Sequence, residues 1–182
     1  MAFVELVTSH AAGEPSAVWQ MGVAEATRHL RYRLTDVDVW DRVGHAPISV
    51  STDKLGSTAL RASRLVQQWE ADRGHRLARD GSGWLVEVYP AAARRCWALD
   101  HVVRDPEALL ARLPAIEVDD VARSLLAGNE HVFDALVAAL VARAAHLGST
   151  RRPPPEVQQQ VDVEGWIHLP DDAHSLEALA GF

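Results

Sequence analysis

The feature that most constrains the fold is an apolar run from Val132 to Ala142, which contains one charged residue, Asp134. Apolar residues recur in it at helical spacing, and the faces between them carry Ala and Val instead of polar side chains. A helix that is apolar on all sides is usually buried. The pattern therefore predicts a central buried helix over Asn129 to Gly148.

Asp134 needs compensation in such a helix, because an unpaired buried carboxylate costs on the order of several kcal/mol. Two structural explanations are open. The first is the positive N-terminal end of its own helix, which acts weakly because Asp134 lies past the first turn, and the second is an Arg from elsewhere in the chain. The functional explanation is a divalent metal ion, and the helix alone does not decide among the three.

Composition limits the function classes. A chain of 182 residues with 48% hydrophobic and 24% charged residues is typical of a globular protein with one core. A net charge of −7 argues against nonspecific binding of nucleic acid through a broad basic surface, although local pairs such as Arg94 and Arg95 remain. A single cysteine, Cys96, excludes an internal disulfide, and no apolar run reaches the roughly 18 residues of a membrane span. We expect a cytoplasmic protein without a membrane segment.

The order of elements follows from periodicity and from breakers such as Gly and Pro. Helices are predicted over 2–12, 17–30, 54–73, 91–98, 105–113, 119–126 and 129–148. Extended segments are predicted over 84–89, which is the best strand, over 163–170, and weakly over 32–40. We expect a single domain over residues 1–170, with an exposed proline linker at 151–155, and a tail with one helical turn over 171–182.

The chain contains no phosphate-binding glycine loop, no nucleophile elbow, no paired cysteines and no histidines at ligand spacing. It does contain a second carboxylate in an apolar element, Glu87, on the strand predicted at 84–89. Taken alone, Glu87 is open to three explanations: an ion pair, a position on an edge strand, or a ligand. Carboxylates such as Glu87 and Asp134 are the ligands that hold Mg²⁺ or Mn²⁺ for phosphodiester cleavage. Lys54 is the one lysine among 18 Lys and Arg residues, which hints that a compact ammonium is useful there.

Four segments, in order, carry a resemblance to a known family: Ser49–Gly56, Glu87–Ala91, His131–Leu140 and Glu164–Pro170. They closely resemble the domain of unknown function 429 family, which is regarded as a predicted RNase H-like nuclease. The resemblance covers the chain from about Phe3 to Pro170.

The resemblance implies a helix-rich, RNase H-like α/β fold with a small mixed sheet. It implies that Glu87 and Asp134 converge as catalytic metal ligands for Mg²⁺ or Mn²⁺, with nucleic acid as the partner. Arg33 and Asp36 match a family Arg-x-x-Asp element, and Asp53 with Lys54 falls in another family motif. Lys54 and Arg33 are the expected phosphate-binding residues, and Asp53 is also expected to cap the helix that follows it.

The sequence departs from the family in one respect. The first strands of an RNase H-like fold precede the segment that corresponds to Phe3, and this sequence starts after them. One of those strands supplies a catalytic Asp. A truncated gene model, a shortened variant, or strands supplied by a partner chain or a second copy would each produce this sequence. Besides an active nuclease, two functions therefore stay open: a non-catalytic binding or scaffold module, and a hydrolase of a small phosphorylated metabolite.

Overall fold

The structure is a computed structural model that describes residues 31–48, 56–99, 105–173 and 175–179. The helices predicted over 2–12 and 17–30, together with Asp53 and Lys54, lie outside these residues. The chain forms two compact units: unit 1 is Met1–Arg79 with Pro154–Gly165, and unit 2 is Asp80–Pro153 with Trp166–Phe182. The expected single domain over 1–170 stays a prediction, and each unit is described by itself.

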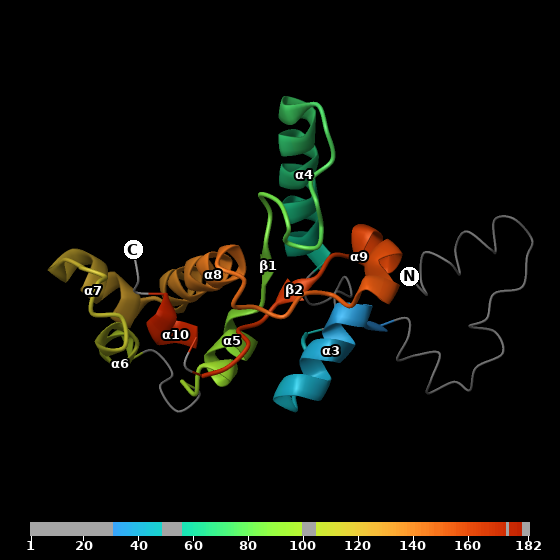
Figure 1. Cartoon of the computed structure of the whole chain (residues 1–182). Helices are drawn as coiled ribbons and strands as arrows, with labels where there is room; N and C mark the ends of the chain where they lie inside the picture. Colours follow the sequence, from blue (N-terminus) through green and yellow to red (C-terminus); the bar gives the residue numbers. More distant parts are fainter. Residues whose placement is uncertain (1–30, 49–55, 100–104, 174, 180–182) are drawn as a thin grey trace, which may run out of the picture. The chain divides into compact units, whose positions relative to one another are not determined.

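Unit 1 consists, in its described part, of helices α3 (Leu34–Val43), α4 (Gly56–Arg73) and α9 (Gln158–Glu164), with a short 3-10 helix, η2 (Pro155–Val157), before α9. Helix α3 packs against α9, although the two are far apart in the sequence (Figure 1). Helix α4 ends at the residue before Gly74, as predicted, but Leu60 and Leu65 on it are exposed. The sequence did not predict α9, because residues 158–162 lie between the predicted linker and the predicted last strand and were given no element.

The extended segment expected over 32–40 is wrong, since α3 begins at Leu34. Alternation of Val37 and Val39 with aspartates suggested a strand, but the buried residues of the helix are Thr35, Asp36 and Val39, at helical spacing. The Asp36 side chain accepts the backbone N–H of Arg33, which caps the helix start. Local capping and burial therefore outweigh the weak alternation.

Unit 2 contains a sheet of two parallel strands, β1 (Glu87–Val88) and β2 (Ile167–His168), in the register Glu87 to Ile167 and Val88 to His168. An isolated antiparallel bridge joins Thr150 to Pro170. The α/β class is confirmed at this coarse level, but the described sheet is parallel where a mixed one was expected. Both strands are also shorter than the segments predicted at 84–89 and 163–170, and Trp84 is 60% exposed.

The helices of unit 2 surround one apolar cluster. They are α5 (Pro90–Cys96), α6 (Pro106–Ala111), α7 (Asp120–Gly128), α8 (Glu130–His146) and α10 (Ser175–Ala178). Helix α8 contacts α5, α7, α10 and both strands. It is the central helix that the apolar run predicts.

The buried face of α8 explains its central place. Phe133, Val137, Leu140 and Val141 are buried there in one cluster with Trp97. Burial of each large apolar side chain contributes roughly 1.5–3 kcal/mol. The sequence prediction is confirmed for the helix and for its inward stripe.

A polar side chain caps the N-terminal end of α6, and another caps that of α8. Asp105 accepts the backbone N–H groups of Glu107 and Ala108 at 3.0 and 3.2 Å, with Pro106 in the first turn. Asn129 accepts the N–H of His131 at 2.9 Å. Both starts follow the capping signals in the sequence.

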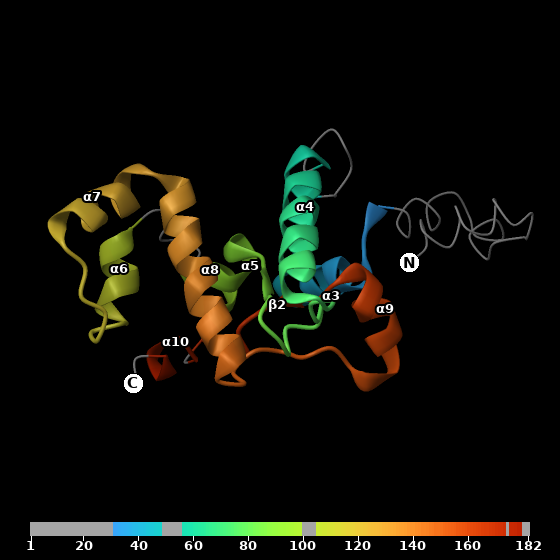
Figure 2. The ribbon, with the colours of Figure 1, turned by 90° about the horizontal axis from the view of Figure 1, so that it is seen from above.

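Apolar spacing predicts that Val121, Leu125 and Leu126 of the helix over 119–126 face inward, and helix α7 differs from this expectation. Leu126 is buried as predicted, but Val121 is 70% exposed and Leu125 is exposed too. The chain bends by 108° between α7 and α8. Helix α7 is therefore not a straight continuation of α8 (Figure 2), and only one edge of it reaches the cluster. In the described ranges no single helix is long and apolar enough to cross a membrane, although α7 and α8 meet that criterion as a bent pair.

The residues after Asp171 contribute to the core. The predicted helical turn is α10, and Leu176 and Leu179 are buried in the cluster around α8. Arg112 holds this segment by donating to the Ala173 carbonyl oxygen and to Glu177. The segment expected to be a tail is therefore packed at these two leucines.

Candidate functional site

Asp134 is paired with Arg94, which α5 presents to the second turn of α8. The Arg94 guanidinium donates a hydrogen bond to Asp134 Oδ1 and lies over the Phe133 ring, 5.8 Å from the ring centre. The side chains are 15% and 33% exposed respectively. Of the explanations that the sequence left open, an arginine from another element is the compensating charge in this structure.

Glu87 lies on β1, which contacts α8. Successive side chains of a strand point to opposite faces, and Val88 packs against the apolar cluster, so Glu87 points to the other face. Glu87 is half-buried, and its negative charge has the smallest of several effects on the pKa of His168, which burial lowers. The structure therefore places the two predicted metal ligands on neighbouring elements, with Asp134 paired to Arg94.

His168 is a buried histidine whose two ring nitrogens both have partners. Nε2 lies 2.9 Å from the Asp80 carbonyl oxygen, and Nδ1 lies 2.8 Å from Thr150 Oγ1. A carbonyl oxygen can only accept, so Nε2 carries a proton. The Thr150 hydroxyl can donate or accept, so it donates to Nδ1 when the imidazole is neutral and accepts from it when the imidazole is charged.

The surroundings favour that neutral form. Burial lowers the pKa of His168, and this outweighs the bond to the Asp80 carbonyl and the charge of Asp80, which raise it. The positive charge of Arg152 lowers the pKa further, while Glu87 raises it slightly. At neutral pH the ring therefore serves as an uncharged link between the Asp80 loop and the segment that follows α8.

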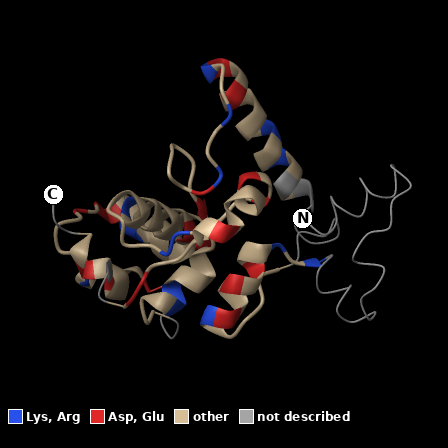
Figure 3. Ribbon diagram, turned by 45° about the vertical axis from the view of Figure 1, so that its right-hand side comes forward, with Lys and Arg blue, Asp and Glu red and all other residues tan. Residues whose placement is uncertain are grey.

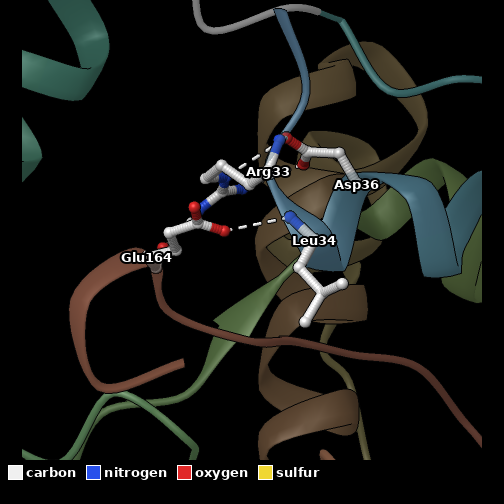
Figure 4. A network of polar contacts seen from close by, with 4 residues as sticks. All are labelled: Arg33, Leu34, Asp36 and Glu164. Carbon is white, nitrogen blue, oxygen red and sulfur yellow. Dashed lines mark hydrogen bonds and ion pairs between the residues drawn. The ribbon is translucent and has the colours of Figure 1, made fainter. Parts of the chain in front are cut away.

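Arg33 and Asp36 form a network with Glu164 in unit 1 (Figure 4). The Arg33 guanidinium donates to both oxygens of Asp36, from Nε at 3.2 Å and from Nη2 at 3.1 Å. It also donates to the Glu164 carbonyl oxygen at 3.1 Å, and Glu164 Oε2 accepts the Leu34 N–H at 3.0 Å. The network fastens α3 to the end of α9, so the Arg-x-x-Asp element has a structural role here.

Charges are mixed on the described elements. Helix α3 carries Asp36, Asp38 and Asp41 against Arg42 at its end, shown in red and blue in Figure 3. Within the described residues, no group of three or more His, Cys, Asp or Glu side chains is arranged to hold a metal ion. Any metal at Glu87 or Asp134 therefore needs water or substrate oxygens among its ligands.

The predicted residues divide into three sets. Glu87 and Asp134 belong to unit 2, whereas Arg33 and Asp36 belong to unit 1. Asp53 and Lys54 lie outside the described residues, and their predicted roles stay predictions.

Sequence reasoning missed the roles of two residues near the predicted site, Arg94 and His168. Arg94 was noted only as half of a basic pair, although its place one helical turn after Pro90 follows directly from the strand–helix order. His168 lies in the Glu164–Pro170 segment, where an apolar strand around one histidine was the available signal. A histidine in such a strand is expected to have hydrogen-bond partners for both nitrogens.

Comparison with known proteins gives one result. Neither a curated protein nor a solved structure matches the chain. The model of the family described as "Protein of unknown function (DUF429)" matches residues 15–159. These residues make up most of the chain and include α3 to α8, Glu87 and Asp134. The chain therefore belongs to the DUF429 family.

Proposed function

We propose that this protein is an RNase H-like nuclease that hydrolyses phosphodiester bonds with Mg²⁺ or Mn²⁺, using Glu87 and Asp134 as metal ligands. The observation that carries the proposal is the packing of β1 against α8 within one unit, with a carboxylate on each element that is not fully buried. Because Glu87 points to the face of β1 opposite the apolar cluster, one ion shared with Asp134 would require the Glu87 side chain to turn towards α8.

The donor chemistry fits such an ion. Mg²⁺ prefers oxygen ligands and is often held by one or two carboxylates, with waters and substrate phosphates completing the set. When bound, the ion lowers the pKa of a coordinated water and neutralises charge on the phosphate. Glu87 and Asp134 would position the ion, and Arg94 would pair with a phosphate oxygen once it leaves Asp134.

Arg94 makes the proposal testable, because it competes with a cation for Asp134. Cleavage of labelled single-stranded and double-stranded DNA and RNA in Mn²⁺ or Mg²⁺ should fall at least tenfold in Glu87→Gln and in Asp134→Asn. Glu130→Gln, which changes an exposed carboxylate in the first turn of the same helix, is the matched control and should leave cleavage unchanged. Equal activity in all of these proteins would remove the nuclease proposal.

A second candidate is a non-catalytic binding module. The Arg94–Asp134 pair favours it, because a carboxylate that is already neutralised needs no metal. Calorimetry separates the two candidates. A metal site predicts Mn²⁺ binding that Asp134→Asn weakens and Arg94→Ala strengthens, whereas the binding module predicts no uptake at millimolar Mn²⁺ in any variant.

Hydrolysis of a small phosphorylated metabolite stays a third candidate function, and a cytoplasmic location stays a prediction. A panel of nucleotides and sugar phosphates, assayed beside the oligonucleotides, distinguishes metabolite hydrolysis from nuclease activity.

A further inference from the structure

Arg94 is held in place by more than its ion pair with Asp134. Ala92 and Ala93 of the same helix are buried, and α5 packs against α8. The Arg94 guanidinium also lies over the ring of Phe133, which is itself buried. A cation over an aromatic ring is attracted to it. The helix and the ring therefore keep this guanidinium at the second turn of α8 even when the Asp134 carboxylate binds something else.

The ion pair uses only part of what each side chain can bind. Within the described residues, the side chains of Arg94 and Asp134 make one hydrogen bond, from Nη1 of the arginine to Oδ1 of the aspartate. A guanidinium carries further N–H donors, and a carboxylate has a second oxygen that can accept or coordinate. Arg94 therefore retains donors for an anion, and Asp134 retains Oδ2 for a cation. Both side chains are partly exposed, so small ions can reach them from the solvent.

Charge determines how a cation and an anion at this pair affect each other. In the pair as it stands, the positive charge of Arg94 and the negative charge of Asp134 cancel. A divalent cation on Asp134 places two positive groups side by side, and their repulsion is screened less at partly buried positions than in bulk water. An anion that pairs with Arg94 removes this repulsion. A phosphodiester is such an anion, because its oxygens match the N–H donors of a guanidinium.

We propose that a divalent cation on Asp134 and a phosphodiester on Arg94 bind cooperatively, because each ligand releases the side chain that the other needs. Such coupling is reciprocal: the phosphodiester raises the affinity for the cation by the same factor by which the cation raises the affinity for the phosphodiester. Without a phosphodiester, Arg94 competes with the cation for Asp134, so the pair is an inhibitory contact that the substrate relieves. The inference rests on the proposed function for its two ligands and adds the regulation of that site.

The test is a titration of the full chain with Mn²⁺, followed by the electron paramagnetic resonance signal of free Mn²⁺, with and without millimolar dimethyl phosphate. Dimethyl phosphate carries the single negative charge of a phosphodiester, and no cleavage is measured. In the wild-type chain it should raise the Mn²⁺ affinity by roughly fivefold or more, the lower end of the usual range for coupled sites. Arg94→Ala should bind Mn²⁺ more tightly than wild type in the absence of dimethyl phosphate, and it should lose most of the enhancement. Arg94→Lys, which keeps the charge, should retain part of the enhancement.

Arg95→Ala is the matched control, because it removes the same charge from the next position of α5, where the side chain is exposed. It should change neither the Mn²⁺ affinity nor the enhancement, since exposed charges are screened. The inference is overturned if dimethyl phosphate leaves the Mn²⁺ affinity of the wild-type chain unchanged, or if it raises that of Arg94→Ala by the same factor. Either result leaves the proposed metal site standing. An absence of Mn²⁺ binding in every variant overturns both the inference and the proposed function, so the two failures are distinct.

Discussion

Gly81 lies directly against the imidazole of His168: a Cβ added to Gly81 would stand 2.0 Å from Nε2. The φ angle of Gly81 is 73°, in the region that favours glycine. The position therefore excludes a side chain for two reasons, one in the backbone and one in the neighbouring ring.

Gly81→Ala should lower the free energy of unfolding by about 2–5 kcal/mol, which combines left-handed strain with overpacking. Gly148→Ala is the matched control in the same unit, because Gly148 has a φ of 75° but nothing within 4 Å of an added Cβ. It should cost only about 1–2 kcal/mol. Urea unfolding of both variants checks the prediction, and equal losses would show that the contact with His168 adds nothing.

His168 predicts a loss of stability in mild acid. Because burial lowers its pKa in the folded chain, the unfolded chain takes up a proton first as the pH falls below about 6.5. The free energy of unfolding should therefore decrease as the pH falls through that value, and it should continue to decrease until the pH reaches the lowered folded pKa. Denaturant unfolding between pH 7.5 and pH 5 measures the slope, to which one group adds at most about 1.4 kcal/mol per pH unit.

A comparison of two histidine variants isolates this contribution. His168→Gln should flatten the slope whatever its effect on stability at pH 7.5, and His131→Gln, which changes an exposed histidine, should leave the slope as it is. A slope that does not change in His168→Gln would contradict the neutral, buried imidazole.

Arg94 and Asp134 should be coupled in a double-mutant cycle. Their charges are partly shielded from water, so the coupling free energy between Arg94→Ala and Asp134→Asn should be roughly 1–3 kcal/mol. The exposed pair Arg123 and Glu107 serves as the control and should show a smaller coupling. Additive effects in the first cycle would mean that the pair contributes no net stability.

Asp36 should be important for the stability of unit 1. Its side chain is 4% exposed and accepts three hydrogen bonds from Arg33, so Asp36→Asn should cost about 1–3 kcal/mol. Asp41→Asn, on the exposed side of the same helix, is expected to be nearly neutral. Hydrogen exchange of α3 amides reports the change locally, and similar exchange in both variants would rule out the capping role of Asp36.

The sequence predicted the elements whose signals are local. The apolar run gave α8 with its inward stripe, and Asp105, Asp119 and Asn129 marked three helix starts. These signals are local because a cap acts within one turn and an apolar stripe acts along one helix.

The rest depended on contacts between distant residues. Alternation over 32–40 suggested an extended segment, but the local Asp36 cap and the bond from Arg33 to Glu164, 131 positions away, together stabilise a helix start. The inward side of α7 was also misjudged, because the angle between α7 and α8 decides which apolar residues are covered. The partner of Asp134 could be named only as an arginine, since no periodicity shows which one reaches it.

The division of the chain into units sets the order in which it can fold. Each unit consists of two pieces of sequence, and residues 154–165 of unit 1 separate the two pieces of unit 2. The Asp80–His168 hydrogen bond joins residues that are 88 positions apart. This bond and the β1–β2 pairing can form only after residues 154–165 and the strand that follows them have been placed. Closing a long loop costs conformational entropy before the contacts between its ends can stabilise the fold. Neither unit therefore completes its folding as a continuous N-terminal piece. Residues from Pro154 to Gly165 complete unit 1, and the later residues, including Leu176 and Leu179, complete unit 2. A chain halted before Pro154 therefore holds helices without their final partners.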